Sequence, residues 1–148
     1  MPFEYQTVTG DAARRADELL AVCAVAFEQF SPAYLTERIG NVAEPCVIAA
    51  RRDDGSLAGF KLGYRRGAVL FYSWLGAVRP DCRRQGIGQE MTRRQHDWAR
   101  VQGYRFVETR TRAVNRAMMI LNLSAGFEVC GFEFDSFGRA LVTQRKSL

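Results

Sequence analysis

The chain has 148 residues, of which 47% are hydrophobic and 25% are charged. These values are close to the average of globular proteins, so we expect a single domain, residues 1–148, with a core of its own. The longest apolar stretch, residues 19–27, is too short to span a bilayer, and no basic leader precedes an apolar run. We therefore expect a cytoplasmic protein without a membrane partner.

The net charge of +5 is distributed unevenly. Residues 1–64 carry six basic and nine acidic side chains, whereas residues 65–148 carry fifteen basic and seven acidic ones. This asymmetry favours an anionic ligand for the second half. Nucleic acid is disfavoured, because the arginines are not interleaved with the exposed aromatic residues on which single-stranded bases stack.

The cysteines indicate neither a metal site nor a disulfide framework. No C-x-x-C pair occurs, and the single histidine cannot complete a zinc site with them. We expect no metal, and reduced thiols at Cys23, Cys46, Cys82 and Cys130. Cys82 precedes two arginines and a predicted helix start, surroundings that favour a thiolate.

The first half of the chain predicts a strand, two helices and a hairpin. Gly10 and Asp11 offer caps for the first helix, and Ser31 followed by Pro32 suits the start of the second. Asp-Asp-Gly at residues 53–55 is typical of a hairpin turn. The expected elements are a strand at 3–8, helices that end near residues 27 and 39, and strands at 45–51 and 57–64.

Residues 83–88, Arg-Arg-Gln-Gly-Ile-Gly, lie where a predicted strand at 69–78 leads into a helix. The first N–H groups of a helix have no internal acceptor, and the helix dipole favours an anion there. Gly86 and Gly88 allow a ligand to approach the backbone and allow unusual turn dihedrals, and the two arginines add positive charge. The sequence therefore predicts a phosphate site for a nucleotide-like cofactor.

Two common nucleotide motifs are disfavoured. A P-loop requires Lys after its last glycine, and a dinucleotide site requires G-x-G-x-x-G near the first strand. With the remaining pattern, R-x-x-G-x-G, the chain resembles the GNAT superfamily of acyl-CoA-dependent N-acyltransferases, whose Q/R-x-x-G-x-G/A turn binds the pyrophosphate of coenzyme A. After a predicted strand at 104–111, residues 115–127 are similar to the second family block, N-x-x-A/M-x-x-L-Y/N-x-x-x-G-F.

The resemblance implies an α/β (α+β) GNAT fold with a mixed sheet of about seven strands and helices on both faces, in the order β-α-α-β-β-β-α-β-α-β-β. It implies transfer of an acetyl group from acetyl-CoA to a primary amine by direct attack, without a metal. The acceptor is expected to be a small-molecule or peptide amine, and a homodimer is possible. The alternative is a non-catalytic acyl-CoA-binding or regulatory domain.

The resemblance also implies a cofactor site. Gly76 marks a bulge in the strand at 69–78 that separates this strand from the next, and the pantetheine arm is expected to lie in the gap. One amide near Val78 is expected to polarise the thioester carbonyl. The implied cofactor-binding residues are Leu75, Gly76, Ala77, Val78, Arg83, Arg84, Gln85, Gly86, Ile87, Gly88, Asn115, Met118 and Asn122.

The catalytic positions depart from the common family pattern. Asn122 stands where many members have a Tyr acid; an amide cannot deliver a proton, so Asn122 either binds the cofactor or is an exposed polar residue. Tyr72 stands where histone-type members have a Glu base. A phenol with a pKa of about 10 is a poor base at neutral pH unless its pKa is lowered or it acts through water. Tyr72 could equally donate a proton to the thiolate, and Glu28 or Glu37 could replace the base.

Packing explains other residues of the predicted helix after residue 86. Ile87, Met91, Trp98 and Ala99 form an apolar stripe expected to face the sheet. His96 lies among charged and polar residues, so we expect it to be solvated.

The acceptor cleft is less well defined by the sequence. Tyr64, Phe71 and Trp74 are candidates for lining it, although aromatic strand residues commonly serve packing. The acidic excess of residues 1–64 favours a cationic amine as the acceptor.

Overall fold

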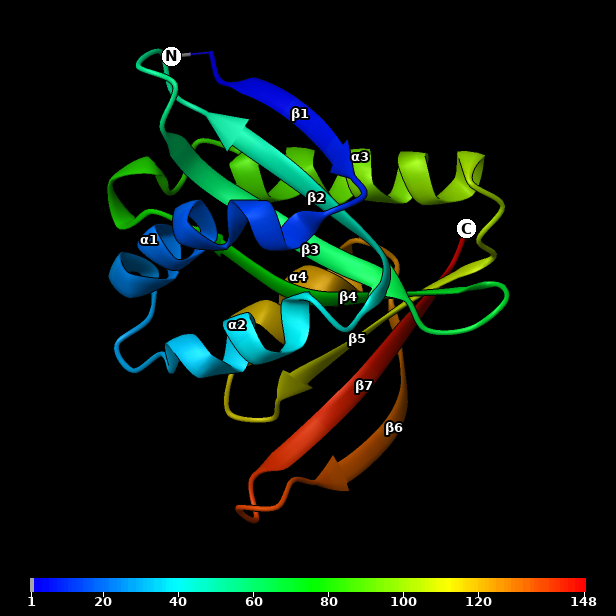
Figure 1. The fold of residues 1–148 in the computed structure, drawn as a ribbon. Coiled ribbons are helices and arrows are strands. Elements are labelled where there is room, and N and C mark those ends of the chain that lie inside the picture. The colour runs from blue at the N-terminus through cyan, green and yellow to red at the C-terminus, as the bar shows by residue number, and fades with distance from the viewer. Residues whose placement is uncertain (1) are drawn as a thin grey trace.

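A computed structural model describes residues 2–148 as a central sheet with helices on both faces (Figure 1). Within these residues the sheet has seven strands, as predicted, and their order across the sheet is β1-β2-β3-β4-β5-β7-β6. The strands are β1 Glu4–Thr9, β2 Ala43–Arg51, β3 Leu57–Arg65, β4 Leu70–Val78, β5 Phe106–Arg112, β6 Glu128–Phe134 and β7 Ala140–Ser147. The helices are α1 Ala16–Ala26, α2 Pro32–Ile39, α3 Ile87–Val101 and α4 Arg116–Ser124, with short 3₁₀ turns at Ala12–Arg15 and Pro80–Cys82.

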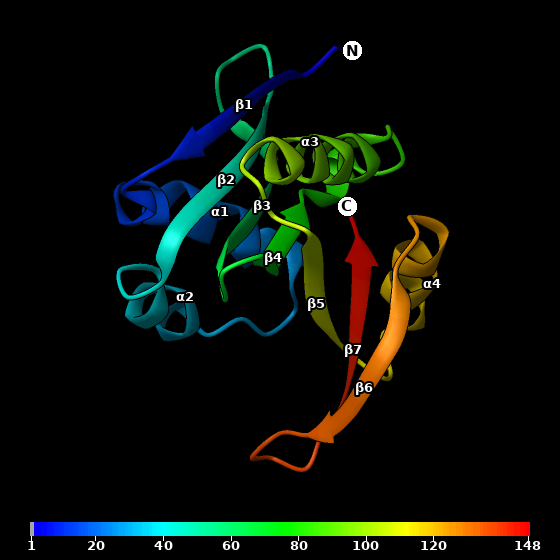
Figure 2. The same ribbon diagram turned by 90° about the vertical axis from the view of Figure 1, so that its right-hand side faces the viewer.

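The two faces of the sheet carry separate cores. Helices α1 and α2 cover one face, where Leu19, Leu35 and Phe60 are buried, and α3 covers the other, where Ile48 and Phe71 are buried (Figure 2). Because both faces are covered, the middle of β2 is a continuous buried run rather than an alternating one. Helix α4 lies beside β6 and β7 in Figure 2.

Strands β4 and β5 are paired only over a short stretch. They are the one parallel pair among the described strands, and their pairing joins Leu70–Tyr72 to Phe106–Glu108. Beyond Tyr72 the β5 side of β4 has no strand partner. The expected separation of these two strands is therefore present.

The predicted bulge at Gly76 is wrong by two residues. Gly76 pairs regularly with Lys61, whereas the register between β3 and β4 shifts at Trp74, between the pairs made by Leu75 and Ser73. The glycine that this region requires lies in β3: a Cβ on Gly63 would fall 2.3 Å from a ring carbon of Phe71. The register shift therefore lies beside Gly63 of β3, which leaves space for the Phe71 ring, and not at a glycine of β4.

The helices differ from the prediction at one start and include no membrane-spanning candidate among the described residues. The first helix begins later than predicted, at Ala16, because a 3₁₀ turn occupies Ala12–Arg15. Within residues 2–148, no helix combines the length and the hydropathy needed to cross a bilayer.

Candidate active site

The turn before α3 has an open, strained backbone. Arg84 and Gly86 both have positive φ, 64° and 80°. A left-handed residue other than glycine costs about 1–2 kcal/mol, and such turns aim successive N–H groups into an anion-binding hollow. A Cβ on Gly86 or Gly88 would meet no atom within 4 Å. Only Gly86 needs the special dihedrals, because Gly88 already lies inside α3.

Arg83 holds this turn in place. Its Nε donates to the carbonyl of Val78, at 3.2 Å, and its Nη2 donates to the carbonyl of Ala26, at 3.1 Å. The side chain therefore joins the turn to the end of β4 and to the end of α1. Arg84 is exposed and is available to an anion.

The unpaired edge of β4 lies next to this turn. The backbone of Leu75, Gly76, Ala77 and Val78 pairs with β3 on one side and has no strand partner on the β5 side. Closer to the last β4–β5 pair, the Thr109 hydroxyl bridges the gap by donating to the carbonyl of Ser73, at 3.0 Å. A ligand with amide groups would thus find backbone donors and acceptors without a strand partner along these residues, apart from the Val78 carbonyl, which accepts from Arg83.

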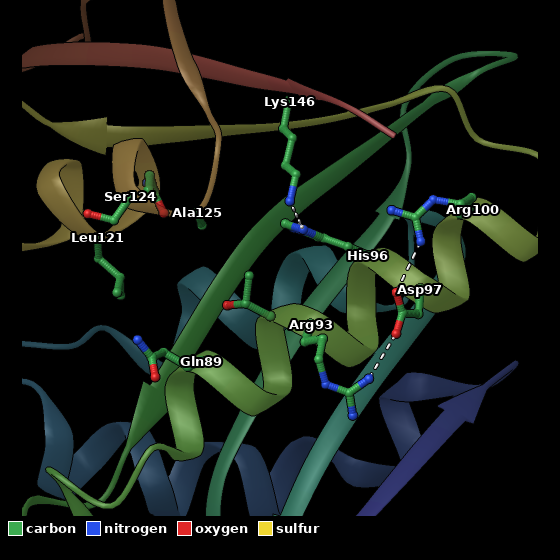
Figure 3. A pocket seen from close by; sticks show the side chains of 11 residues that line it. Gln89, Arg93, His96, Asp97, Arg100, Leu121, Ser124, Ala125 and Lys146 are labelled. Carbon is green, nitrogen blue, oxygen red and sulfur yellow. Dashed lines mark hydrogen bonds and ion pairs between the residues drawn. The ribbon is translucent and has the colours of Figure 1, made fainter.

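A pocket of about 280 Å³ lies between α3, α4 and the end of β7 (Figure 3). Of the cofactor-binding residues expected from the sequence, Asn122 alone lines it. The sequence did not predict Lys146, which comes from β7 and reaches the pocket through long-range pairing. The lining residues are Gln89, Thr92, Arg93, His96, Asp97, Arg100, Leu121, Asn122, Ser124, Ala125 and Lys146.

His96 is buried, and the expectation of a solvated histidine is wrong. It is 3% exposed, packs on Phe127, and has its Nδ1 3.3 Å from the Nζ of Lys146. Burial, then the positive charge of Lys146, lowers its pKa to about 3. The side chain is on the flank of α3 that faces α4 and β7.

The predicted apolar stripe of α3 faces the sheet. Ile87, Met91 and Ala99 are buried in the core under α3, and Trp98 packs against it. The polar Gln95 is also buried on this helix.

Asn122 is also buried, so the exposed alternative is wrong. It is 8% exposed, and its Nδ2 donates to the Oε1 of Gln144 in β7, at 2.9 Å. Asn115 caps α4 by accepting from the N–H of Met118, at 3.2 Å. Asn115 and Met118 are exposed, whereas Asn122 lines the pocket.

The environment of Cys82 does not favour a thiolate. Burial raises the pKa of the thiol, and Asp81, which accepts from its Sγ at 3.5 Å, raises it further. Arg83 is committed to the carbonyls of Val78 and Ala26 instead. Within residues 2–148, no three side chains of His, Cys, Asp or Glu gather as metal ligands.

Tyr72 lies at the last β4–β5 pair, on the α1 and α2 face. It is 6% exposed; its ring centroid is 5.5 Å from that of Tyr64, and the guanidinium of Arg66 lies 4.2 Å from it. Burial raises the pKa of the phenol, against the lowering effects of Arg110 and Arg66. This environment therefore does not lower the pKa of Tyr72, as a base would require, and the phenol keeps its proton at neutral pH.

The carboxylate nearest to Tyr72 along the sheet was not predicted. Glu108 pairs with Tyr72 across β4 and β5, is mostly buried, and forms an ion pair of 3.1 Å with Arg145. Glu28 and Glu37 are exposed, and none of the three carboxylates is among the groups that most affect the pKa of Tyr72. The sequence held one sign of this role: Glu108 is a charged residue within a strand that was predicted to lie in the sheet.

The three candidate aromatic residues divide between the two faces. Tyr64 and Trp74 pack with Tyr72 below α1 and α2, with 6.0 Å between the centroids of Tyr64 and Trp74. Phe71 packs under α3 against Trp98 instead, with centroids 5.4 Å apart. Neighbouring strand residues point to opposite faces, so Phe71 cannot share a cleft with Tyr72.

Lys61 is an unexpected cation on the α3 face of β3. It pairs with Gly76, and its Cγ lies 3.6 Å from the position that a Gly76 Cβ would take. Burial lowers its pKa to about 8, and no neighbouring carboxylate opposes that effect. A Cβ at Gly76 would thus be in ordinary van der Waals contact with the lysine stem.

The comparison with protein families agrees with this geometry. The model of the acetyltransferase (GNAT) family matches residues 13–127. The chain belongs to the GNAT family. Members of this family use acetyl-CoA, and both the strained turn and the free edge of β4 fit such a ligand. No curated protein sequence matches the chain significantly.

Solved structures of other GNAT proteins have the same fold. The ribosomal-protein-S18-alanine N-acetyltransferase from Escherichia coli is similar with a TM-score of 0.81 and 17% identity, over 97% of this chain and 94% of that chain. A GCN5-related N-acetyltransferase from Kribbella flavida has a TM-score of 0.72 and 20% identity, over 97% and 98%. A Bacillus anthracis protein, solved in complex with acetyl coenzyme A, has a TM-score of 0.65 and 17% identity, over 73% and 65%.

Proposed function

We propose that this GNAT protein transfers the acetyl group of acetyl-CoA to a primary amine. The observation that carries the proposal is the divergence of β4 from β5 beside an open helix N-terminus. The N–H groups around Gly86 and Gly88 would bind the pyrophosphate, with Arg84 adding charge. The backbone of Leu75 to Val78 would bind the pantetheine arm, and the flanks of the site would be formed by Gln85, Ile87, Asn115, Met118 and Asn122.

The reaction requires two proton transfers. The amine nitrogen forms a bond to the acetyl carbon while the carbon–sulfur bond breaks, the amine loses a proton and the departing sulfur gains one. Tyr72 keeps its proton at neutral pH, which suits a donor to the sulfur. For the other transfer, Glu108 opposite Tyr72 is a better-placed carboxylate than Glu28 or Glu37.

A non-catalytic acyl-CoA-binding domain is the second candidate. It is favoured by the engagement of Asn122 with Gln144 and by the lack of a carboxylate among the groups that act on Tyr72. The two functions share the cofactor site and differ in turnover. The homodimer and the cytoplasmic location stay predictions; β1 and β6 are the two edge strands at which a second copy could pair.

The test is titration calorimetry with acetyl-CoA, followed by release of coenzyme A with a panel of amines. Binding with amine-dependent release supports the transferase, and binding without release with any amine supports the second candidate. Absence of binding at millimolar acetyl-CoA would refute both. The Gly86→Val variant is the control, because a branched residue at φ 80° both occupies the ligand space and resists the turn.

A further inference from the structure

Two arginines without a carboxylate partner lie on the aromatic cluster around Tyr72. The Arg38 guanidinium, from α2, lies 4.8 Å from the ring centroid of Trp74, and its Nη2 donates to the Tyr64 hydroxyl at 3.5 Å. The Arg66 guanidinium lies 4.2 Å from the ring centroid of Tyr72. Among the described residues, no Asp or Glu forms an ion pair with either guanidinium.

The same rings connect both arginines. Tyr64 lies 5.5 Å from Tyr72 and 6.0 Å from Trp74, measured between ring centroids, so Arg38 and Arg66 sit on one continuous cluster. Arg110 and Arg66, both positive, are the formal charges that most affect the pKa of the Tyr72 phenol. Glu108, opposite Tyr72, is paired with Arg145, so Arg66 keeps its charge without a carboxylate partner.

Two acidic side chains of the first half are neutralised by arginines other than Arg38 and Arg66. Glu18 is paired with Arg51 at 2.9 Å, and Glu44 is paired with Arg65. Arg110 is likewise occupied by Glu133, at 3.1 Å. Arg38 and Arg66, by contrast, have no carboxylate partner among the described residues.

Stacked guanidinium groups are well suited to a carboxylate. A ring covers the flat face of the group, while the N–H groups at its edge stay free and form a fork that matches two carboxylate oxygens. A ring below also limits the rotamers of a long side chain, so less entropy is lost when a ligand binds. A cationic amine would meet repulsion at the same position.

We propose that the acceptor is an amino acid, whose carboxylate binds Arg38 and Arg66 while its amine lies beside Tyr72. This inference rests on the proposed acetyl transfer. It assigns the substrate class, an amine that bears a carboxylate, and it assigns binding roles to two residues outside the cofactor site.

The first experiment compares matched acceptors with the full chain and acetyl-CoA. The panel contains the twenty common amino acids, their carboxamides, and the decarboxylated amines such as cadaverine for lysine, with spermidine added. We expect at least one amino acid to be acetylated with a kcat/KM ten or more times that of its carboxamide and of its decarboxylated amine. Equal or better use of the carboxamides or of spermidine would overturn the inference while leaving acetyl transfer intact.

The remaining outcomes separate this inference from the proposed function. Binding of acetyl-CoA without turnover of any acceptor overturns the inference and favours the non-catalytic domain. Absence of acetyl-CoA binding overturns the proposed function itself, and the inference with it.

The second experiment uses Arg38→Gln and Arg66→Gln. Each change is expected to raise the KM for the amino acid at least tenfold, to leave the KM for acetyl-CoA unchanged, and to reduce the preference for the acid over its carboxamide. Arg105→Gln, an exposed residue between α3 and β5, is the matched control. Thermal unfolding confirms that each variant is folded, and an unchanged acid preference in both variants would overturn the assignment.

Discussion

Replacement of Lys61 by methionine should stabilise the protein. The lysine is covered by α3, its pKa falls from 10.5 to about 8 through burial, and no carboxylate compensates. At about 1.4 kcal/mol per pH unit, that fall corresponds to about 3 kcal/mol of lost stability at neutral pH. Part of the side chain still contacts solvent, so we expect a gain of about 1–3 kcal/mol from Lys61→Met, whose unbranched stem fits the same path.

The pH dependence of this gain follows from the sign of the shift. A folded-state pKa below the unfolded value means that the charged amine destabilises the fold fully below pH 8, and that this effect disappears as the pH rises to 10.5. The difference in unfolding free energy between the variant and the unchanged protein should therefore be constant near pH 7 and shrink between pH 8 and 10.5.

Urea unfolding at constant ionic strength measures both quantities, because the difference between two proteins cancels the other titrating groups. Arg105→Met is the control: it removes an exposed charge and should alter the free energy by less than about 0.5 kcal/mol. A Lys61→Met protein that is no more stable at pH 7, or a gain that does not change up to pH 10.5, would refute the view of Lys61 as a buried, unpaired cation.

Four further predictions concern the site. Gly88→Ala should fold with unchanged or slightly higher stability, because its Cβ meets no protein atom, yet calorimetry should show at least tenfold weaker acetyl-CoA binding; normal binding would contradict the turn assignment. His96, the only histidine, should show no NMR titration above pH 5. Because its pKa is lowered in the folded state, the unfolding free energy of the protein should fall by about 2 kcal/mol between pH 6.5 and 5, and a His96→Leu variant should not show this fall. Tyr72→Phe should lower kcat about 10²-fold with unchanged acetyl-CoA affinity, and full activity would exclude a proton-donor role. Asn122→Ala should lower the unfolding free energy by about 1–3 kcal/mol, because the buried Oε1 of Gln144 loses its hydrogen-bond donor, and an unchanged urea midpoint would contradict this.

The sequence predicted those parts of the site that depend on neighbouring residues. The turn at residues 83–88 could be recognised because backbone conformation and glycine content are local properties. The order of helices and strands along the chain and the separation of β4 from β5 followed from the resemblance to GNAT proteins. The bulge was misplaced because a glycine in β4 was taken as its signal, whereas the glycine in β3 makes room for Phe71.

The residues that were missed come together through long-range contacts. His96 is buried because Lys146, fifty residues later, and Phe127 pack beside it. Lys61 and Glu108 looked like single charges within strands, and only the pairing of these strands shows what covers them. Local sequence patterns do not show which distant residues pack together, so the surroundings of these side chains could be found only from the tertiary structure.

The geometry of β4 separates the two binding tasks. Its free edge from Leu75 to Val78 leads to the turn before α3, whereas Tyr72 and the rings that carry Arg38 and Arg66 lie at the other end, under α1 and α2. Changes at Gly88 and at Arg66 share no contact, so their effects on acetyl-CoA binding and on acceptor binding should add in the double variant. A strongly non-additive loss in kcat/KM would instead mean that the bound cofactor completes the acceptor site.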